Sequence, residues 1–162
     1  AGCAIRFKMD VVTGFTFELG FTDALGDETL PAVTDVDTPA TGNSATDVAV
    51  IHLDTDQTLT TAAFVSESTG TAYAAQKANL GTFTPTAAKW YTAIVQLNGD
   101  TAMCAIYNTD TAGHPILQDG TDKSLVLALE GGTLVRPHFL FGTRNTTAKV
   151  TDVDFIRVWQ DR

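Results

Sequence analysis

The chain has 162 residues, of which 44% are hydrophobic and 18% charged, and its formal net charge is −9. This length is enough for one domain with a real core, and the composition argues against a disordered chain. An acidic chain repels the phosphate backbone of nucleic acids. Its longest apolar runs are far shorter than the roughly 20 residues needed to span a bilayer. We therefore expect one domain over residues 1–162, with neither nucleic acid nor membrane as a partner. Because the chain begins with Ala1 and enters a strand at once, either residues were removed or it is part of a longer polypeptide extending N-terminally.

Period-two alternation predicts two strands at the start of the chain. Residues 4–11 (AIRFKMDV) place apolar side chains on one face and Arg6 and Lys8 on the other, which indicates a strand with one wet face. Residues 15–22 (FTFELGFT) give the cleanest strand signal, and Gly14 marks the turn before them. We expect these two strands to pair as a hairpin.

Residues 24–47 carry no periodicity and contain several proline, glycine, threonine and aspartate residues. A loop this long is uncommon in a compact domain and is often functional. Two interpretations stay open for it: a mobile surface excursion, or an arm that contacts a partner.

Eight further strands are expected, separated by turn residues. They cover residues 47–54, 60–67, 71–78, 90–97, 100–107, 124–129, 134–142 and 149–160. We expect the strands at 60–67 and 71–78 to pair as a hairpin through residues 68–70. Asn98-Gly99 predicts a type I′ turn between two strands that are apolar on both faces and so belong at the centre of a sheet.

About ten short strands with no convincing helix predict an all-β fold, an antiparallel sandwich of two sheets. No short internal repeat is present, which argues against a propeller or a solenoid.

Three segments of the second half resemble a known fold family. KWYTAIVQLNGDTAMCAIYN, LVRPHFLFGT and VTDVDFIRVWQDR, in that order, resemble the second half of a concanavalin A-like (laminin-G/glucanase-type) jelly-roll sandwich. The ending DFIRVWQ is similar to the last strand of laminarinase-type glycoside hydrolases. It resembles more closely the ending of tailed-bacteriophage virion proteins that use this sandwich, and AIRFKM and FELGFTD suit the opening strands of those proteins.

The resemblance implies a jelly-roll sandwich and a structural role in a virion. We expect a capsid decoration protein on the surface of a bacteriophage head, with capsid or other virion proteins as partners. Decoration proteins of this kind meet at symmetry axes, so a homo-oligomer is expected. The main alternative is a carbohydrate-binding (lectin-like) module of a tail fibre or host-recognition protein, with a glycan as the partner.

The sequence departs from the glycoside hydrolases in its acids. Their active strand carries E-x-D-x-x-E, because retaining cleavage needs two carboxylates about 5–5.5 Å apart. That motif is absent, and each glutamate is isolated in sequence. We therefore expect that the chain is not an enzyme and that it has no catalytic residues. The glutamates are Glu18, Glu28, Glu67 and Glu130.

Paired aspartates are the candidates for a hard-cation site, because calcium takes oxygen ligands. None has the spacing of an EF-hand loop, and the pair at Asp54, at a strand end, is the best of them. The histidines are far apart in sequence, whereas zinc needs three or four convergent ligands. We expect no metal and no cofactor, and we place Asp152 and Asp154 on the solvated face of the last strand. The residues considered are Asp35, Asp37, Asp54, Asp56, Asp152, Asp154, His52, His114 and His138.

Four aromatic residues are candidates for stacking on sugars if the chain is a lectin: Trp90, Tyr91, Tyr107 and Trp159. Aromatic side chains on sandwich strands more often fill the core or cover its edge, and we favour that role. The two cysteines, Cys3 and Cys104, lie in separate predicted strands, and we expect small buried thiols rather than a disulfide.

Overall fold

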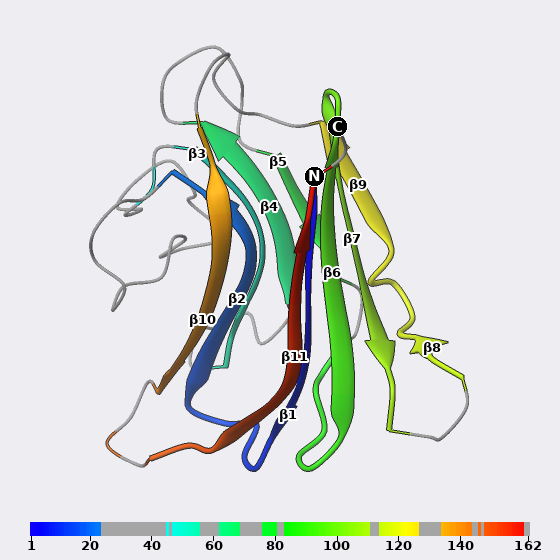
Figure 1. Cartoon of the computed structure of the whole chain (residues 1–162). Helices are drawn as coiled ribbons and strands as arrows, with labels where there is room; N and C mark the ends of the chain where they lie inside the picture. Colours follow the sequence, from blue (N-terminus) through cyan, green and yellow to red (C-terminus); the bar gives the residue numbers. More distant parts are fainter. Residues whose placement is uncertain are drawn as a thin grey trace.

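The computed structural model describes residues 1–23, 45, 47–55, 62–68, 76–80, 83–110, 114–126, 134–143, 146 and 148–160. These residues form eleven strands and no helix, arranged as two antiparallel sheets packed against each other (Figure 1). The predicted all-β sandwich is confirmed. The described part of the chain contains no helix with the length and hydropathy of a membrane span.

The six-stranded sheet has the order β11-β1-β6-β7-β8, and β9 also pairs with β7. Its strands are β1 (Gly2–Met9), β6 (Trp90–Asn98), β7 (Thr101–Asn108), β8 (Ile116–Leu117), β9 (Lys123–Val126) and β11 (Thr151–Trp159).

The five-stranded sheet has the order β10-β2-β3-β4-β5. Its strands are β2 (Phe15–Thr22), β3 (Asp47–Asp54), β4 (Ala63–Ser68), β5 (Gln76–Asn79) and β10 (Arg136–Thr143).

The core lies between the two sheets and is rich in aromatic side chains. Phe7 on β1 stacks on Phe17 on β2 with their ring centroids 4.8 Å apart, so this pair joins the two sheets. Phe141 on β10 contacts both rings, at 5.5 and 5.1 Å. Because burying each ring removes a large apolar area from water, this cluster supplies much of the stability of the fold.

The predicted hairpin of the first two strands is wrong. β1 pairs with β6 and β11 in one sheet, whereas β2 pairs with β3 and β10 in the other. The connection 10–14 therefore crosses between the sheets. Alternation fixes which face of a strand is apolar, but it does not tell which sheet the strand joins.

Two other hairpins are confirmed, with one change in the turn. β4 pairs with β5, and β6 pairs with β7 at the centre of the six-stranded sheet. Because Asn98 pairs with Thr101, the two central turn residues are Gly99 and Asp100 rather than Asn98 and Gly99. Of these two, only Gly99 has a positive φ (57°), which is the type II′ pattern and not the predicted type I′. The two-residue strand β8 was not predicted, because two residues carry no periodicity.

Both faces of the five-stranded sheet are buried at its centre. Every residue of β2 and β3 is buried, and a second apolar cluster lies on the face directed away from the core. The members of that cluster are Ala45, Val48, Val50, Ala63 and Val65.

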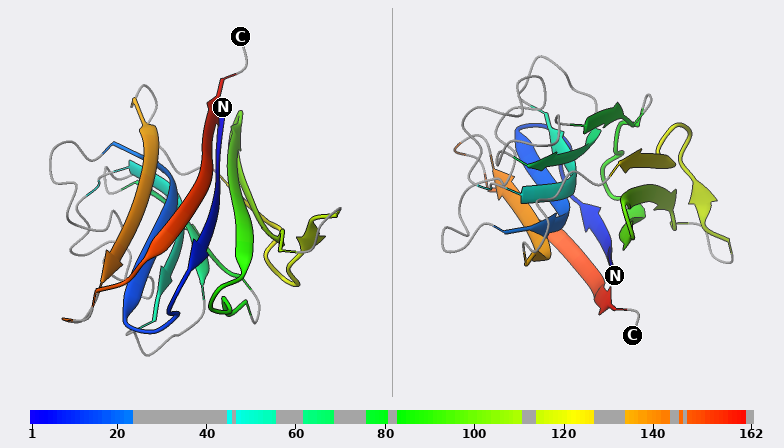
Figure 2. Two further views of the ribbon diagram at one scale, coloured as in Figure 1. Left: turned by 60° about the horizontal axis from the view of Figure 1, so that its bottom comes forward. Right: turned by 90° about the horizontal axis from the view of Figure 1, so that it is seen from above.

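The two long sides of the sandwich differ. On one side, β9 of the six-stranded sheet contacts β4 and β5 of the other sheet. On the opposite side lie the edge strands β10 and β11, which are joined at one end and diverge towards the other (Figures 1 and 2). The core is therefore closed along one side and open along the other.

Candidate functional site

A buried carboxylate on β2 lies between two histidines from the neighbouring strands. The Oε1 atom of Glu18 lies 2.8 Å from Nδ1 of His52 on β3, and its Oε2 atom lies 2.7 Å from Nε2 of His138 on β10. Glu18 has no exposed surface, and His138 is only partly exposed. The contacts tie three adjacent strands together on the face of the sheet directed away from the core.

The two histidines control the ionisation of Glu18. Burial alone raises the pKa of this carboxyl, but the hydrogen bonds from His138 and His52 and their charges lower it, and the resulting pKa is about 2. The carboxylate is therefore charged at neutral pH. Within the part of the chain that the structure describes, the buried Nε2 of His52 and Oγ1 of Thr16 have no hydrogen-bond partner.

This cluster has residue types that bind metals, but it is not arranged as a metal centre. Within the described residues, no group of three or more His, Cys, Asp or Glu side chains is placed to hold a metal ion. Both oxygens of Glu18 are used in contacts with the two rings, and the carboxylate has no exposed surface. We interpret the cluster as a structural clamp on the five-stranded sheet.

The clamp was not predicted from the sequence, because Glu18 is isolated there and the histidines are far apart. His52 lies 34 residues from Glu18, and His138 lies 120 residues from it, so only the strand order brings them together. One signal was present. His52 follows Val48 and Val50 on the second face of its strand, and a strand that is apolar on both faces is buried on both.

The outer face of the six-stranded sheet carries a shallow groove of about 410 Å³. Its lining residues are Arg6, Thr92, Ile94, Tyr107, Thr109, Pro115 and Phe155. The polar groups of this lining are largely paired with one another. The Arg6 guanidinium donates to Oγ1 and to the backbone oxygen of Thr109 at 3.2 Å each, and to Asp154 at 2.5 Å.

The four aromatic candidates take different places. Tyr91 is buried in the core, in edge-to-face contact with Phe83, so it has no route to a sugar. Trp90 is half-buried, with Arg6 and Lys8 over its ring at 4.5 and 5.0 Å. Tyr107 lines the groove. Trp159 packs over Gly2, where an added Cβ would lie 2.2 Å from the indole ring.

The open side of the sandwich exposes side chains that face the core elsewhere. On β11, the residues on the inner face are Val153, Ile156 and Val158, which are 45%, 54% and 52% exposed. On β10, the residues on the inner face are Pro137, Phe139 and Phe141, none of which is fully buried. We call this open edge, lined by these six residues, the seam.

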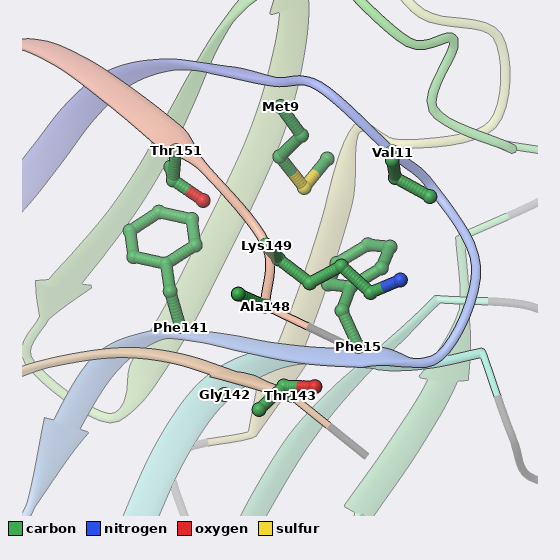
Figure 3. Close-up of a pocket in the computed structure, with 9 residues that line it drawn as sticks. All are labelled: Met9, Val11, Phe15, Phe141, Gly142, Thr143, Ala148, Lys149 and Thr151. Atoms are coloured by element: carbon green, nitrogen blue, oxygen red, sulfur yellow. The ribbon is translucent and has the colours of Figure 1, made fainter. Parts of the chain in front are cut away.

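A pocket of about 290 Å³ lies at the end of the seam where β10 and β11 are connected (Figure 3). Met9 of the six-stranded sheet lies on one side of the pocket, Phe15 and Phe141 of the five-stranded sheet lie on the other, and the side chain of Lys149 extends over Phe15. This volume lies at the lower limit of small-molecule sites, which span about 300–1,000 Å³.

The remaining candidates give no site. Asp152 and Asp154 are exposed and pair with Lys8 at 2.8 Å and with Arg6, so their predicted place on the solvated face is confirmed. Asp54 is buried at the end of β3, and His114 is exposed. Other candidates lie outside the described residues or, for Glu67, have a side chain that the structure does not describe. These are Asp35, Asp37, Asp56, Glu28, Glu67, Glu130 and nearly all of the loop 24–47.

Both cysteines are free, buried thiols, as predicted. Burial raises the pKa of Cys3 and of Cys104 to about 12. Such thiols are poor nucleophiles, because the thiolate is the reactive form.

Comparison with known proteins found no matching family model, no similar curated protein and no similar solved structure.

Proposed function

We propose that this chain is a non-catalytic structural protein of a virion, a decoration protein on the surface of a bacteriophage head. The observation that carries the proposal is the seam, where apolar side chains on the inner face of β11 are exposed to solvent beside a well-packed core. A contiguous exposed apolar patch on a stable domain marks an interaction surface. The seam is where the chain meets capsid or other virion proteins.

The sequence supports this direction. AIRFKM, FELGFTD and DFIRVWQ resemble the corresponding strands of phage virion proteins, and the acidic motif of the related hydrolases is absent. A net charge of −9 keeps a displayed subunit soluble. The clamp around Glu18 stabilises the sheet without adding chemistry.

Cross-linking mass spectrometry of intact particles that contain the chain tests the proposal. Lys149 lies at the end of the seam, whereas Lys123 lies on β9, on the closed side of the sandwich, and serves as the internal control. We expect amine cross-links from Lys149 to another particle protein in clear excess over those from Lys123. Absence of the chain from purified particles, or the reverse ratio of cross-links, would contradict it.

A glycan-binding role is the second candidate, because the groove on the outer face of the six-stranded sheet is flanked by the rings of Tyr107 and Phe155. Binding on a glycan array that is lost in Tyr107→Ala and Phe155→Ala, with the melting temperature unchanged, would support it. The virion proposal predicts no glycan binding. Tyr91→Ala is not a usable variant, because that ring is part of the core.

A further inference from the structure

We propose that the clamp around Glu18 is a pH-sensitive switch in which His138 is the titrating group. In mild acid the ring of His138 takes up a proton while the ring of His52 stays neutral. The charged ring then holds the edge strand β10 more tightly to the centre of the five-stranded sheet. This inference goes beyond the proposed function and does not depend on what the seam contacts.

The geometry of the clamp fixes where the hydrogen atoms of the two rings lie. Glu18 is a carboxylate, which accepts hydrogen bonds and cannot donate them. Nδ1 of His52, 2.8 Å from Oε1, and Nε2 of His138, 2.7 Å from Oε2, must therefore each carry a hydrogen. Both rings satisfy this condition while they are neutral. A further proton can enter only at the other nitrogen of either ring.

The two rings differ at that other nitrogen. Nε2 of His52 is buried and has no hydrogen-bond partner within the described residues, and only 2% of the side chain is exposed. A proton there would leave a charged ring with a buried N–H group that has no acceptor, which is costly. The side chain of His138 is 17% exposed, and its Nδ1 atom is not among the buried unpartnered atoms of the described residues. A proton on that atom is hydrated, so His138 is the ring that titrates.

The nearest charge to His138 favours this proton. The buried Glu18 carboxylate on β2 is in direct contact, whereas Arg136, on the same face of β10, lies two residues or about 6.6 Å of strand away and opposes the proton. The carboxylate dominates, because Coulomb energy falls with distance and a buried charge is weakly screened. Of the other described charged side chains on this face, Asp54 lies at the end of β3 and Lys77 lies on β5, at the opposite edge of the sheet.

The proton on His138 strengthens the link between β10 and its only partner in the sheet, β2. In the unfolded chain this imidazole has no buried carboxylate beside it, so the folded chain binds the proton more tightly. The stability gained in this way is present in mild acid and is lost as the pH rises. Imidazole is the side chain that ordinarily changes its charge between pH 5 and pH 8. The opposite dependence, from Glu18, begins only near pH 4.5, the ordinary pKa of that carboxyl.

The test is urea unfolding of the full chain between pH 7.5 and pH 5.5, with two matched variants. His138→Gln keeps a hydrogen-bond donor but cannot titrate, and His114→Gln removes an exposed histidine outside the clamp. As the pH falls over this range, the folding equilibrium constant should rise about three- to tenfold in the wild type and in His114→Gln. In His138→Gln it should stay constant within about twofold. No rise in the wild type, or an equal rise in His138→Gln, would overturn the proposal.

An NMR titration of the wild type keeps the proposal testable if His138→Gln folds poorly. The ring signals of His138 should shift between pH 7.5 and pH 5.5, whereas those of His52 should stay constant, with nitrogen shifts of the Nδ1–H tautomer. Hydrogen-exchange protection of the β10 amides, corrected for the intrinsic rate, should rise more than that of the β9 amides as the pH falls. Titration of His52 in place of His138, or equal changes in protection of β10 and β9, would contradict the switch.

Discussion

The centre of the sandwich buries a charged side chain, whereas its open edge exposes apolar ones. Glu18, at the centre of the five-stranded sheet, has no exposed surface, whereas Ile156, on the edge strand β11, is 54% exposed. Polarity alone predicts the reverse. Each region is consistent once its surroundings are considered. The carboxylate is hydrogen-bonded to two imidazoles, and the isoleucine lies where none of the described strands of the other sheet covers it.

A closer comparison holds the residue type constant. Ile5 on β1 and Ile156 on β11 are direct cross-strand partners in the same sheet and on the same face, yet Ile5 has no exposed surface. The two strands have the same inward apolar pattern and differ in position, because β1 lies within the sheet and β11 at its edge. Burial here is a property of the place of a strand in the sandwich, and an apolar side chain left at such an edge is available for assembly.

Removing the carboxylate from the centre should have the largest effect. In Glu18→Ala, the buried imidazole of His52 and the partly exposed imidazole of His138 lose their shared partner, and breaking a buried ionic cluster costs about 3–5 kcal/mol. Urea unfolding measures this change. Glu18→Gln, which keeps a hydrogen-bonding side chain, should lose less. A loss within about 1 kcal/mol for Glu18→Ala would mean that the clamp contributes little to the sheet.

Truncating the two isoleucines tests the comparison directly. Ile5→Ala should lower the free energy of unfolding by about 2–5 kcal/mol, because it removes methylene groups and leaves a cavity in the core. Ile156→Ala should change it by less than about 0.5 kcal/mol at concentrations where the chain is monomeric. Similar losses from both variants would show that the edge is as well packed as the centre.

Acid should weaken the centre before it affects the edge. The pKa of Glu18 is about 2 in the folded chain, below its ordinary value of 4.5, so the unfolded chain takes up the proton first as the pH falls. The stability that Glu18 contributes is present above about pH 4.5 and is lost between there and pH 2. Its size is about 3 kcal/mol at most. The difference between wild type and Glu18→Gln, followed by urea unfolding from pH 6 to pH 2, isolates this contribution; a constant difference would contradict the lowered pKa.

The strands of the fold could be predicted from the sequence, but the assignment of strands to sheets could not. Alternation in residues 4–11 and 15–22 is a local signal and located β1 and β2 within two residues. The expected hairpin between them failed, because the crossing at 10–14 depends on which partners lie further along the chain. Asn98-Gly99 correctly indicated the β6–β7 hairpin and misplaced its turn by one residue.

The candidate sites depend even more on tertiary position. The clamp around Glu18 requires β10 to lie beside β2, a pairing across more than a hundred residues that no local pattern encodes. The seam is harder still to foresee, because the inward residues of β11 are as apolar as those of any core strand. The exposed aspartates of β11 were placed correctly, since charge opposite apolar residues indicates a solvated face in either setting. The buried thiols and the core position of Tyr91 were also predicted correctly.

The reactivity of cysteine side chains distinguishes the core from the open edge, and of the tests proposed here it changes stability least. Cys3 and Val158 are cross-strand partners on the same inner face, one buried and the other 52% exposed. Burial raises the pKa of Cys3 to about 12 from 9.0, which lowers its thiolate fraction near pH 8 about a thousandfold. An aromatic disulfide reagent should therefore modify Val158→Cys at the rate of an exposed thiol, while Cys3 and Cys104 react only as the chain unfolds. Native-state labelling of Cys3 as fast as that of Val158→Cys would mean that the core is open beyond the seam.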